Sequence, residues 1–203
     1  MNTSFFEYEE KYRSLGYPLV AGVDEAGRGP LAGAVYAAAV IFDEGVYIEG
    51  INDSKKLTAK KRDELYDEII AKARAYSIFS VDEKTIDKIN ILEATFKAFQ
   101  GAISGLNPSP DFVLIDGNRA KGIDIPHETV VKGDSLSFSI ASASILAKVA
   151  RDRYIEDADK LYPQYGFALH KGYGTKAHLE AIKKYGPCPI HRLTFKGVKE
   201  YVK

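Results

Sequence analysis

The sequence contains a single cysteine, Cys188, which excludes a disulfide within the chain and favours a reducing compartment. It also lacks any run that approaches the roughly 18 consecutive apolar residues required by a membrane-spanning helix. The first residues carry Glu7, Glu9 and Glu10 where a secretory signal would need an apolar centre. These absences predict a cytoplasmic protein with no membrane partner.

A net charge is absent too, because 28 Lys and Arg residues balance 28 Asp and Glu residues. The overall charge therefore gives no sign of a polyanionic partner, although its distribution is uneven. Residues 170–203 hold eight Lys and Arg against two Asp and Glu. Two explanations stay open for this basic end: a solvated helix face, or a surface on which residues such as Arg192 and Lys196 contact nucleic-acid phosphates.

The chain has no repeat and no low-complexity linker, and its length suits one domain over residues 1–203. Apolar patterns predict strands at residues 19–25, 33–42, 76–81, 112–115 and 128–131. Helices are predicted at residues 58–73, 84–104, 137–159 and 175–185. The first three strands lie too close together in sequence for full crossovers. We therefore expect an α/β fold in which a three-strand meander and two crossover strands form a mixed sheet flanked by helices.

Four acidic residues share one position, the end of a predicted strand. Asp24 and Glu25 end the first strand, Asp116 ends the fourth, and Asp134 follows the fifth. Carboxyl ends of neighbouring strands meet in one crevice of an open α/β sheet. Such a cluster needs cations against its own repulsion, and oxygen-only ligands suit Mg²⁺ or Mn²⁺. The alternative is that each acid is a separate turn or capping residue.

Two further features lie near these acids. Adjacent strand residues point to opposite faces, so Glu25 joins Asp24 only if the strand breaks there, which the following glycine-rich sequence favours. That sequence, Gly27-Arg28-Gly29, is either a tight turn or a loop whose backbone N–H groups face a phosphate.

On the predicted helix 137–159, three polar residues follow a spacing of four and three: Ser144, Lys148 and Arg151. This spacing places them on one stripe beside an alanine-rich buried side. The stripe is either a solvated face or a set of contacts to successive phosphates, of which we retain Ser144 and Lys148 as candidate substrate-binding residues.

Seven blocks, in order between about residues 19 and 196, strongly resemble the ribonuclease HII (type 2 ribonuclease H) family. They are VDEAGRGP at 23–30, NDSKKL at 52–57, DG at 116–117, KGD at 132–134, SxxAKxxRD at 144–152, HKGYGT at 170–175 and GPxPIHR at 186–192. Each block alone is weak, but the ordered set is highly specific and covers nearly the whole chain.

The resemblance implies an endonuclease that cuts RNA in RNA–DNA hybrids and at single ribonucleotides in duplex DNA, thereby removing misincorporated ribonucleotides. The family cuts on the 5′ side of the ribonucleotide and leaves a 3′-hydroxyl and a 5′-phosphate. Its fold is the ribonuclease H-like five-stranded mixed sheet. On this basis we expect a catalytic core of about residues 1–165, a helical substrate-binding segment of about 166–203, and a monomer.

The resemblance also implies roles for single residues. Asp24, Glu25, Asp116 and Asp134 match the family's catalytic acids, and we expect the first three to bind two Mg²⁺ or Mn²⁺ ions. The loop Gly27, Arg28 and Gly29 matches the one that holds the backbone around the ribonucleotide. Tyr173 matches the tyrosine that packs on the sugar at the RNA–DNA junction, whereas spacing alone would make it a packed loop aromatic.

Two positions depart from the family pattern: Cys188 stands where a small hydroxyl residue is common, and Leu193 where a basic residue is common. Both concern the grip on DNA. The related ribonuclease HIII carries an N-terminal extension and typically has Lys in place of Arg28, so we expect ribonuclease HII. The alternatives are a ribonuclease HIII-like or other nuclease with the ribonuclease H fold, and a hybrid-binding module without catalysis.

Overall fold

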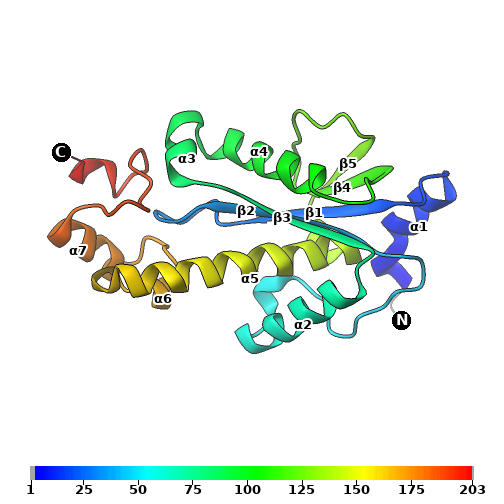
Figure 1. Cartoon of the computed structure of the whole chain (residues 1–203), viewed down its shortest axis with the longest axis horizontal. Coiled ribbons are helices and arrows are strands. Elements are labelled where there is room, and N and C mark those ends of the chain that lie inside the picture. Colours follow the sequence, from blue (N-terminus) through cyan, green and yellow to red (C-terminus); the bar gives the residue numbers. More distant parts are fainter. Residues whose placement is uncertain (1–2, 203) are drawn as a thin grey trace.

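The computed structural model describes residues 3–202, which form one mixed β-sheet between layers of helices (Figure 1). The strand order is β3-β2-β1-β4-β5. β1–β2 and β2–β3 are antiparallel, whereas β1–β4 and β4–β5 are parallel. The predicted meander with two crossover strands is therefore confirmed. The strands are β1 Val20–Ala26, β2 Val35–Ile41, β3 Ala75–Val81, β4 Phe112–Asp116 and β5 His127–Val130.

The helices cover both faces and both ends of the sheet (Figure 1). One face carries α3 (Glu83–Ile89) and α4 (Ile91–Ser104), and the other carries α2 (Ala59–Lys72) and α5 (Phe138–Leu161). α1 (Glu7–Ser14) lies at one end, and α6 (Phe167–His170) and α7 (Lys176–Tyr185) lie at the opposite end. Among residues 3–202, none of the helices combines the length and the apolar character needed to span a bilayer.

Successive side chains of the central strands point to opposite faces of the sheet, and the core is therefore divided into two layers. Val23, Ala37 and Ala39 pack in the cluster that contains Phe96 and Phe99 of α4. The intervening residues of β2 pack against α5 and α2 in a second cluster that includes Ala38, Val40, Ile145 and Leu65. The period of two therefore decides which face each β1 side chain occupies, the acidic ones included.

Small residues let α5 approach the sheet closely. A Cβ atom on Gly22 of β1 would lie 2.2 Å from the backbone carbon of Ser139. Real atoms do not approach so closely, so only glycine permits this distance between helix and strand. The contact holds the start of α5 against β1, and Ser144, further along α5, comes within hydrogen-bonding reach of Asp24.

The single helix predicted at residues 84–104 is wrong, because two helices occupy this range. Asn90 lies between them with φ of 69°, and its side chain accepts hydrogen bonds from the N–H groups of Leu92 and Glu93. An N-cap competes with continuation of the preceding helix. The apolar residues Ile89 and Leu92 keep helical spacing across the break, which is why periodicity did not reveal it.

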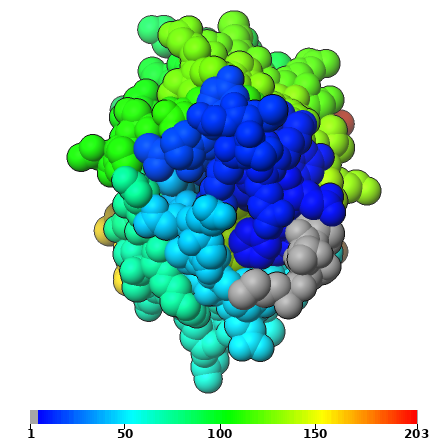
Figure 2. All heavy atoms as spheres, turned by 90° about the vertical axis from the view of Figure 1, so that its right-hand side faces the viewer, coloured from blue at the N-terminus to red at the C-terminus, as the bar shows by residue number. Residues whose placement is uncertain are grey.

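Helix α1 was not predicted either. Figure 2 shows the N-terminal residues, in blue, spread over the end of the molecule that faces the viewer. Tyr12 of α1 stacks on Phe112 of β4, with ring centroids 3.6 Å apart. Glu9 accepts hydrogen bonds from the hydroxyl groups of Ser137 and Ser139 at the start of α5. α1 therefore closes the sheet at the end opposite α7.

Candidate active site

Asp24 and Glu25 lie on opposite faces of the sheet. β1 stays paired with β2 through Ala26, with Asp24 opposite Ala38 and Glu25 opposite Ala37. Asp24 is buried on the side of α5, and Glu25 borders a pocket on the side of α4. The expected strand break at Glu25 is therefore wrong. The bend starts later, at Gly27 with φ of 97°, because the pairing with β2 continues one residue beyond Glu25.

Asp116 occupies the neighbouring strand at nearly the same level. Val23 pairs with Ile115, so Asp24 and Asp116 each follow the last registered pair of β1 and β4. An Asp116 carboxylate oxygen accepts a hydrogen bond of 2.7 Å from the N–H of Gly133. That bond ties β4 to the short helix Gly133–Ser135, which carries Asp134.

The carboxylates influence one another although they do not converge on one point. Burial raises the pKa of Asp24 well above its ordinary value, and the charges of Glu25 and Asp116 add to the shift. Burial also raises the pKa of Glu25, against the lowering effect of Arg28, whose guanidinium lies 3.4 Å away. For Asp116, burial and then the charge of Asp134 raise the pKa. The end of the sheet is thus a region of unbalanced negative charge.

Lys55 adds a second cation to this region beside Arg28, and sequence reasoning missed it. Its ammonium lies 3.9 Å from a carboxylate oxygen of Asp134. Burial acts to lower the pKa of Lys55, but the charges of Asp134, Asp53 and Asp24 outweigh it and the pKa is raised. The block NDSKKL, noted above only as part of a family pattern, was the available signal.

A pocket of about 260 Å³ opens beside the acids on the side of α4, with Glu25, Asp116, Arg28, Asn118 and Arg119 in its lining. A larger hollow of about 920 Å³ lies in the C-terminal segment near Cys188 and Leu193. The smaller pocket is the better candidate for the active site, because the carboxylates of Glu25 and Asp116 border it.

The donor chemistry fits divalent metal ions. Carboxylate oxygens are the ligands preferred by Mg²⁺ and Mn²⁺. Burial, and after it repulsion from neighbouring carboxylates, raises the pKa of Asp24 and Asp116, and cations would relieve that repulsion. Within residues 3–202, no three His, Cys, Asp or Glu side chains are close enough together to form a complete metal site.

Two buried arginines, Arg192 and Arg151, donate hydrogen bonds to backbone carbonyls of the loop that follows β1. Arg192 donates hydrogen bonds of 2.5–2.9 Å to the backbone carbonyls of Gly27, Arg28, Pro30 and Gly33. It is fully buried, so the hypothesis that it contacts phosphates is wrong. Charge in a sequence does not reveal whether carbonyl oxygens enclose it. Lys196, by contrast, is exposed.

Tyr173 lies beside the loop 27–29. A Cβ atom on Gly29 would lie 3.5 Å from the Tyr173 ring. Tyr173 is 48% exposed, and its neighbour Gly172 accepts a hydrogen bond from the N–H of Leu31 at 2.8 Å. A glycine turn and an exposed aromatic ring thus form one continuous surface next to Glu25.

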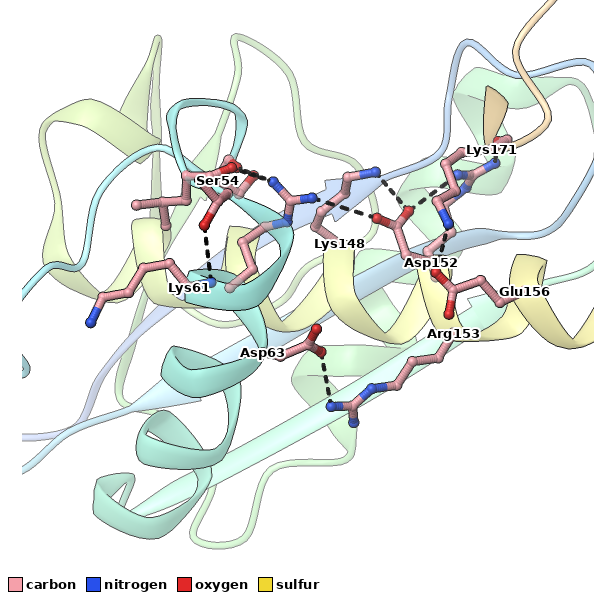
Figure 3. A network of polar contacts seen from close by, with 12 residues as sticks. Ser54, Lys61, Asp63, Lys148, Asp152, Arg153, Glu156 and Lys171 are labelled. Atoms are coloured by element: carbon pink, nitrogen blue, oxygen red, sulfur yellow. Dashed lines mark hydrogen bonds and ion pairs between the residues drawn. The ribbon is translucent and has the colours of Figure 1, made fainter. Parts of the chain in front are cut away.

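The stripe on α5 has three different environments. Ser144 is buried; its hydroxyl lies 2.7 Å from that of Ser54 and acts to lower the pKa of Asp24. Lys148 points toward Asp152, with 2.6 Å between ammonium and carboxylate (Figure 3). Arg151 is buried and donates to the carbonyls of Ala32 and Lys171, so neither a solvated face nor a phosphate contact describes it.

The chain is similar to known proteins over nearly its whole length. A family model described as Ribonuclease HII matches residues 21–198. Ribonuclease HII of Caldicellulosiruptor bescii is 55% identical over 192 residues, which cover 95% of this chain and 93% of the relative. Ribonuclease HII of Geotalea uraniireducens is 56% identical over 200 residues, covering 98% and 93%. The crystal structure of ribonuclease H2 from Pyrococcus horikoshii OT3 superposes with a TM-score of 0.76 at 30% identity, covering 90% of this chain and 96% of that one.

Proposed function

The chain belongs to the ribonuclease HII family, and from this premise we propose that it cuts duplex DNA at single embedded ribonucleotides as well as RNA in RNA–DNA hybrids. Members of the family are hydrolytic ribonucleases, so the chain is an enzyme. We further propose that it cuts on the 5′ side of the ribonucleotide and leaves a 3′-hydroxyl and a 5′-phosphate.

One observation carries the proposal: Glu25 and Asp116 line a pocket together with Arg28, and the Tyr173 ring lies against Gly29, the residue next to Arg28. We propose that Asp24, Glu25 and Asp116 bind Mg²⁺ or Mn²⁺ and that Asp134 acts with them. Bound metal ions would supply activation of water and stabilisation of the leaving oxygen.

The remaining groups suit substrate placement. The exposed ring of Tyr173 offers an apolar face to a sugar, and the adjacent turn at Gly29 leaves room for a backbone to approach. Arg28 is exposed beside Glu25 and suits a phosphate. Lys148 can bind a phosphate only if its ion pair with Asp152 breaks. Ser144 is buried, so we propose that Ser144 acts through its hydrogen bond to Asp24.

The alternatives lose support. The chain is 19% identical to a solved ribonuclease HIII, a likeness that shows the fold alone, against 52–58% identity to ribonucleases HII. A hybrid-binding module without catalysis is not supported either, because members of the family are enzymes. We retain residues 166–203 as the proposed substrate-binding segment, acting through Tyr173 and exposed lysines, and we propose a monomer in the cytoplasm.

An end-labelled duplex with one ribonucleotide tests the proposal. With Mg²⁺ or Mn²⁺ we expect one cut, 5′ of the ribonucleotide, and none with chelator. An all-DNA duplex of the same sequence is the control and should stay intact. Polymerase extension and ligation of the products identify the 3′-hydroxyl and 5′-phosphate. Cutting elsewhere, or cutting of the all-DNA duplex, contradicts the proposed specificity.

A further inference from the structure

Two buried histidines meet behind the loop that carries Tyr173. His178 of α7 and His191 of the C-terminal segment are 0% and 1% exposed, and their Nε2 atoms lie 3.0 Å apart. The ring of His170 stacks on that of His178, with centroids 4.3 Å apart. None of these rings takes part in the metal chemistry proposed above.

Backbone groups of fixed polarity close both ends of this pair. The N–H of Cys188 donates to Nδ1 of His191 at 2.9 Å. Nδ1 of His178 lies 2.9 Å from the carbonyl oxygen of Tyr173, which can only accept. His191 must therefore carry its proton on Nε2 and donate to Nε2 of His178. His178 must in turn carry its proton on Nδ1 and donate to Tyr173.

Only neutral rings satisfy this chain. A second proton on His178 would set two donors 3.0 Å apart between the Nε2 atoms, and a second proton on His191 would set its Nδ1 donor 2.9 Å from the donating N–H of Cys188. Burial lowers the pKa of both His178 and His191 to about 4. Burial raises the pKa of the nearby Cys188 thiol to about 11, so the thiol supplies no negative charge to an imidazolium. The other rings packed around the pair are His170, Tyr165 and Phe167.

Leu31 and Arg151 hold the segment before Tyr173 by donating hydrogen bonds to the carbonyls of Gly172 and Lys171. Lys171 and Gly172 both have positive φ, 51° and 80°, so the chain turns sharply there. The Tyr173 carbonyl accepts a second hydrogen bond of 2.8 Å, from the N–H of Thr175. The two bonds fix the orientation of this peptide group, and with it the direction in which the Tyr173 side chain leaves the backbone.

We propose that His178 and His191 are positioning residues, which hold Tyr173 against the Gly29 turn through a hydrogen-bond chain of fixed direction. The chain runs from Cys188 N–H through His191 and His178 to the Tyr173 carbonyl. This inference rests on the proposed function in so far as Tyr173 contacts the sugar of the ribonucleotide. Cys188 contributes its backbone N–H, which a small hydroxyl residue at this position would supply equally.

Nitrogen-15 NMR of histidine-labelled protein, without substrate, tests the chain directly. At pH 7 we expect His178 to carry its proton on Nδ1 and His191 on Nε2, with single-histidine variants providing the assignment. An Nε2 proton on His178, or an imidazolium at either residue, overturns the inference. This readout does not depend on cleavage, so it stands or fails separately from the proposed function.

Single-turnover cleavage of the one-ribonucleotide duplex tests the consequence. His178→Leu removes the donor to Tyr173, whereas the amide of His178→Asn retains an N–H near the Nδ1 position. Misplacement by about 1 Å costs on the order of a hundredfold in rate. We therefore expect His178→Leu to lose roughly tenfold to a hundredfold and His178→Asn to keep most of the activity. Equal losses in the two variants overturn the inference.

A double-mutant cycle separates positioning from general stability. In a Tyr173→Ala background, His178→Leu should cause little further loss, because the residue on which it acts is gone. Ile182→Ala, on the same helix and equally buried, is the matched control: it should lower the unfolding temperature and leave the cleavage rate nearly unchanged. If His178→Leu lowers the cleavage rate by the same factor in both backgrounds, its role is merely structural. If His178→Leu does not fold, the Asn variant and the NMR measurement decide.

Discussion

Arg192→Met tests how the loop after β1 is held. Methionine keeps an unbranched side chain but removes the guanidinium, which donates five hydrogen bonds to four backbone carbonyls. Hydrogen bonds to charged groups contribute about 1.5–3 kcal/mol each and do not add, so breaking such a buried network costs about 3–5 kcal/mol. A domain of this kind has about 5–15 kcal/mol of stability in total.

The expected result is a large loss of stability with little change in the surface exposed on unfolding. Urea unfolding followed by circular dichroism should show a lower midpoint at an unchanged slope. At about 2–4 °C per kcal/mol for a chain of this length, the melting temperature should fall by roughly 6–20 °C. Arg192→Lys keeps the charge but not the planar fork, so it should recover only part of the loss.

Lys196→Met provides the matched control in the same segment. Lys196 is exposed, so its replacement should change stability by less than about 0.5 kcal/mol. If Arg192→Met unfolds at the wild-type midpoint, the carbonyls around Arg192 are satisfied in another way and the reasoning is refuted.

Three further predictions concern the site. Asp24→Asn should abolish cleavage and raise the melting temperature in chelator, because it removes a buried charge repelled by Glu25 and Asp116; ordinary turnover by the folded variant contradicts the metal-site proposal. Tyr173→Phe should keep much of the single-turnover rate that Tyr173→Ala loses, if the ring face and not the hydroxyl meets the sugar; calorimetric Mn²⁺ titration should give equal affinities for both. Urea midpoints should fall as the pH drops from about 6.5 toward 4, because unfolded histidines take up protons there while His178, with a pKa of about 4, does not. The slope should be shallower in His178→Leu, and this comparison separates the histidine from Asp24, whose raised pKa acts in the opposite direction.

Local rules predicted the sheet well because its strands obey them. Apolar runs bounded by turns gave β1, β2 and β3, and their short separations gave the antiparallel meander. The same rules failed between Glu83 and Ser104, where Asn90 caps a second helix in a sequence whose apolar spacing continues unbroken. A side-chain cap of this kind is a local competition that periodicity does not record.

The sequence pointed to candidate site residues, whose roles stay predictions, but not to their geometry. The shared position at strand ends pointed to all four acids, but not to the opposite faces of Asp24 and Glu25, which depend on how far the ladder with β2 continues. The buried state of Arg151 and Arg192 was not predictable, since their partners are backbone carbonyls distant in sequence. The histidine pair was missed for the same reason: His178 and His191 meet only in three dimensions.

Because α5 packs directly on Gly22, this helix fixes the distance between the carboxylates and the turn that carries Tyr173. Ser144, beside Asp24, and Arg151, which binds the carbonyl of Lys171, are seven residues apart on one rod, or about 10 Å along its axis. Because the rod cannot slide over Gly22 without a clash, the span from the carboxylates to the Tyr173 turn is set by the count of residues between them. One inserted residue between Ser144 and Arg151 would turn the rest of the helix by about 100° and carry Arg151 away from both of its carbonyls. Within this stretch, the protein therefore tolerates exchange of side chains far better than a change of length.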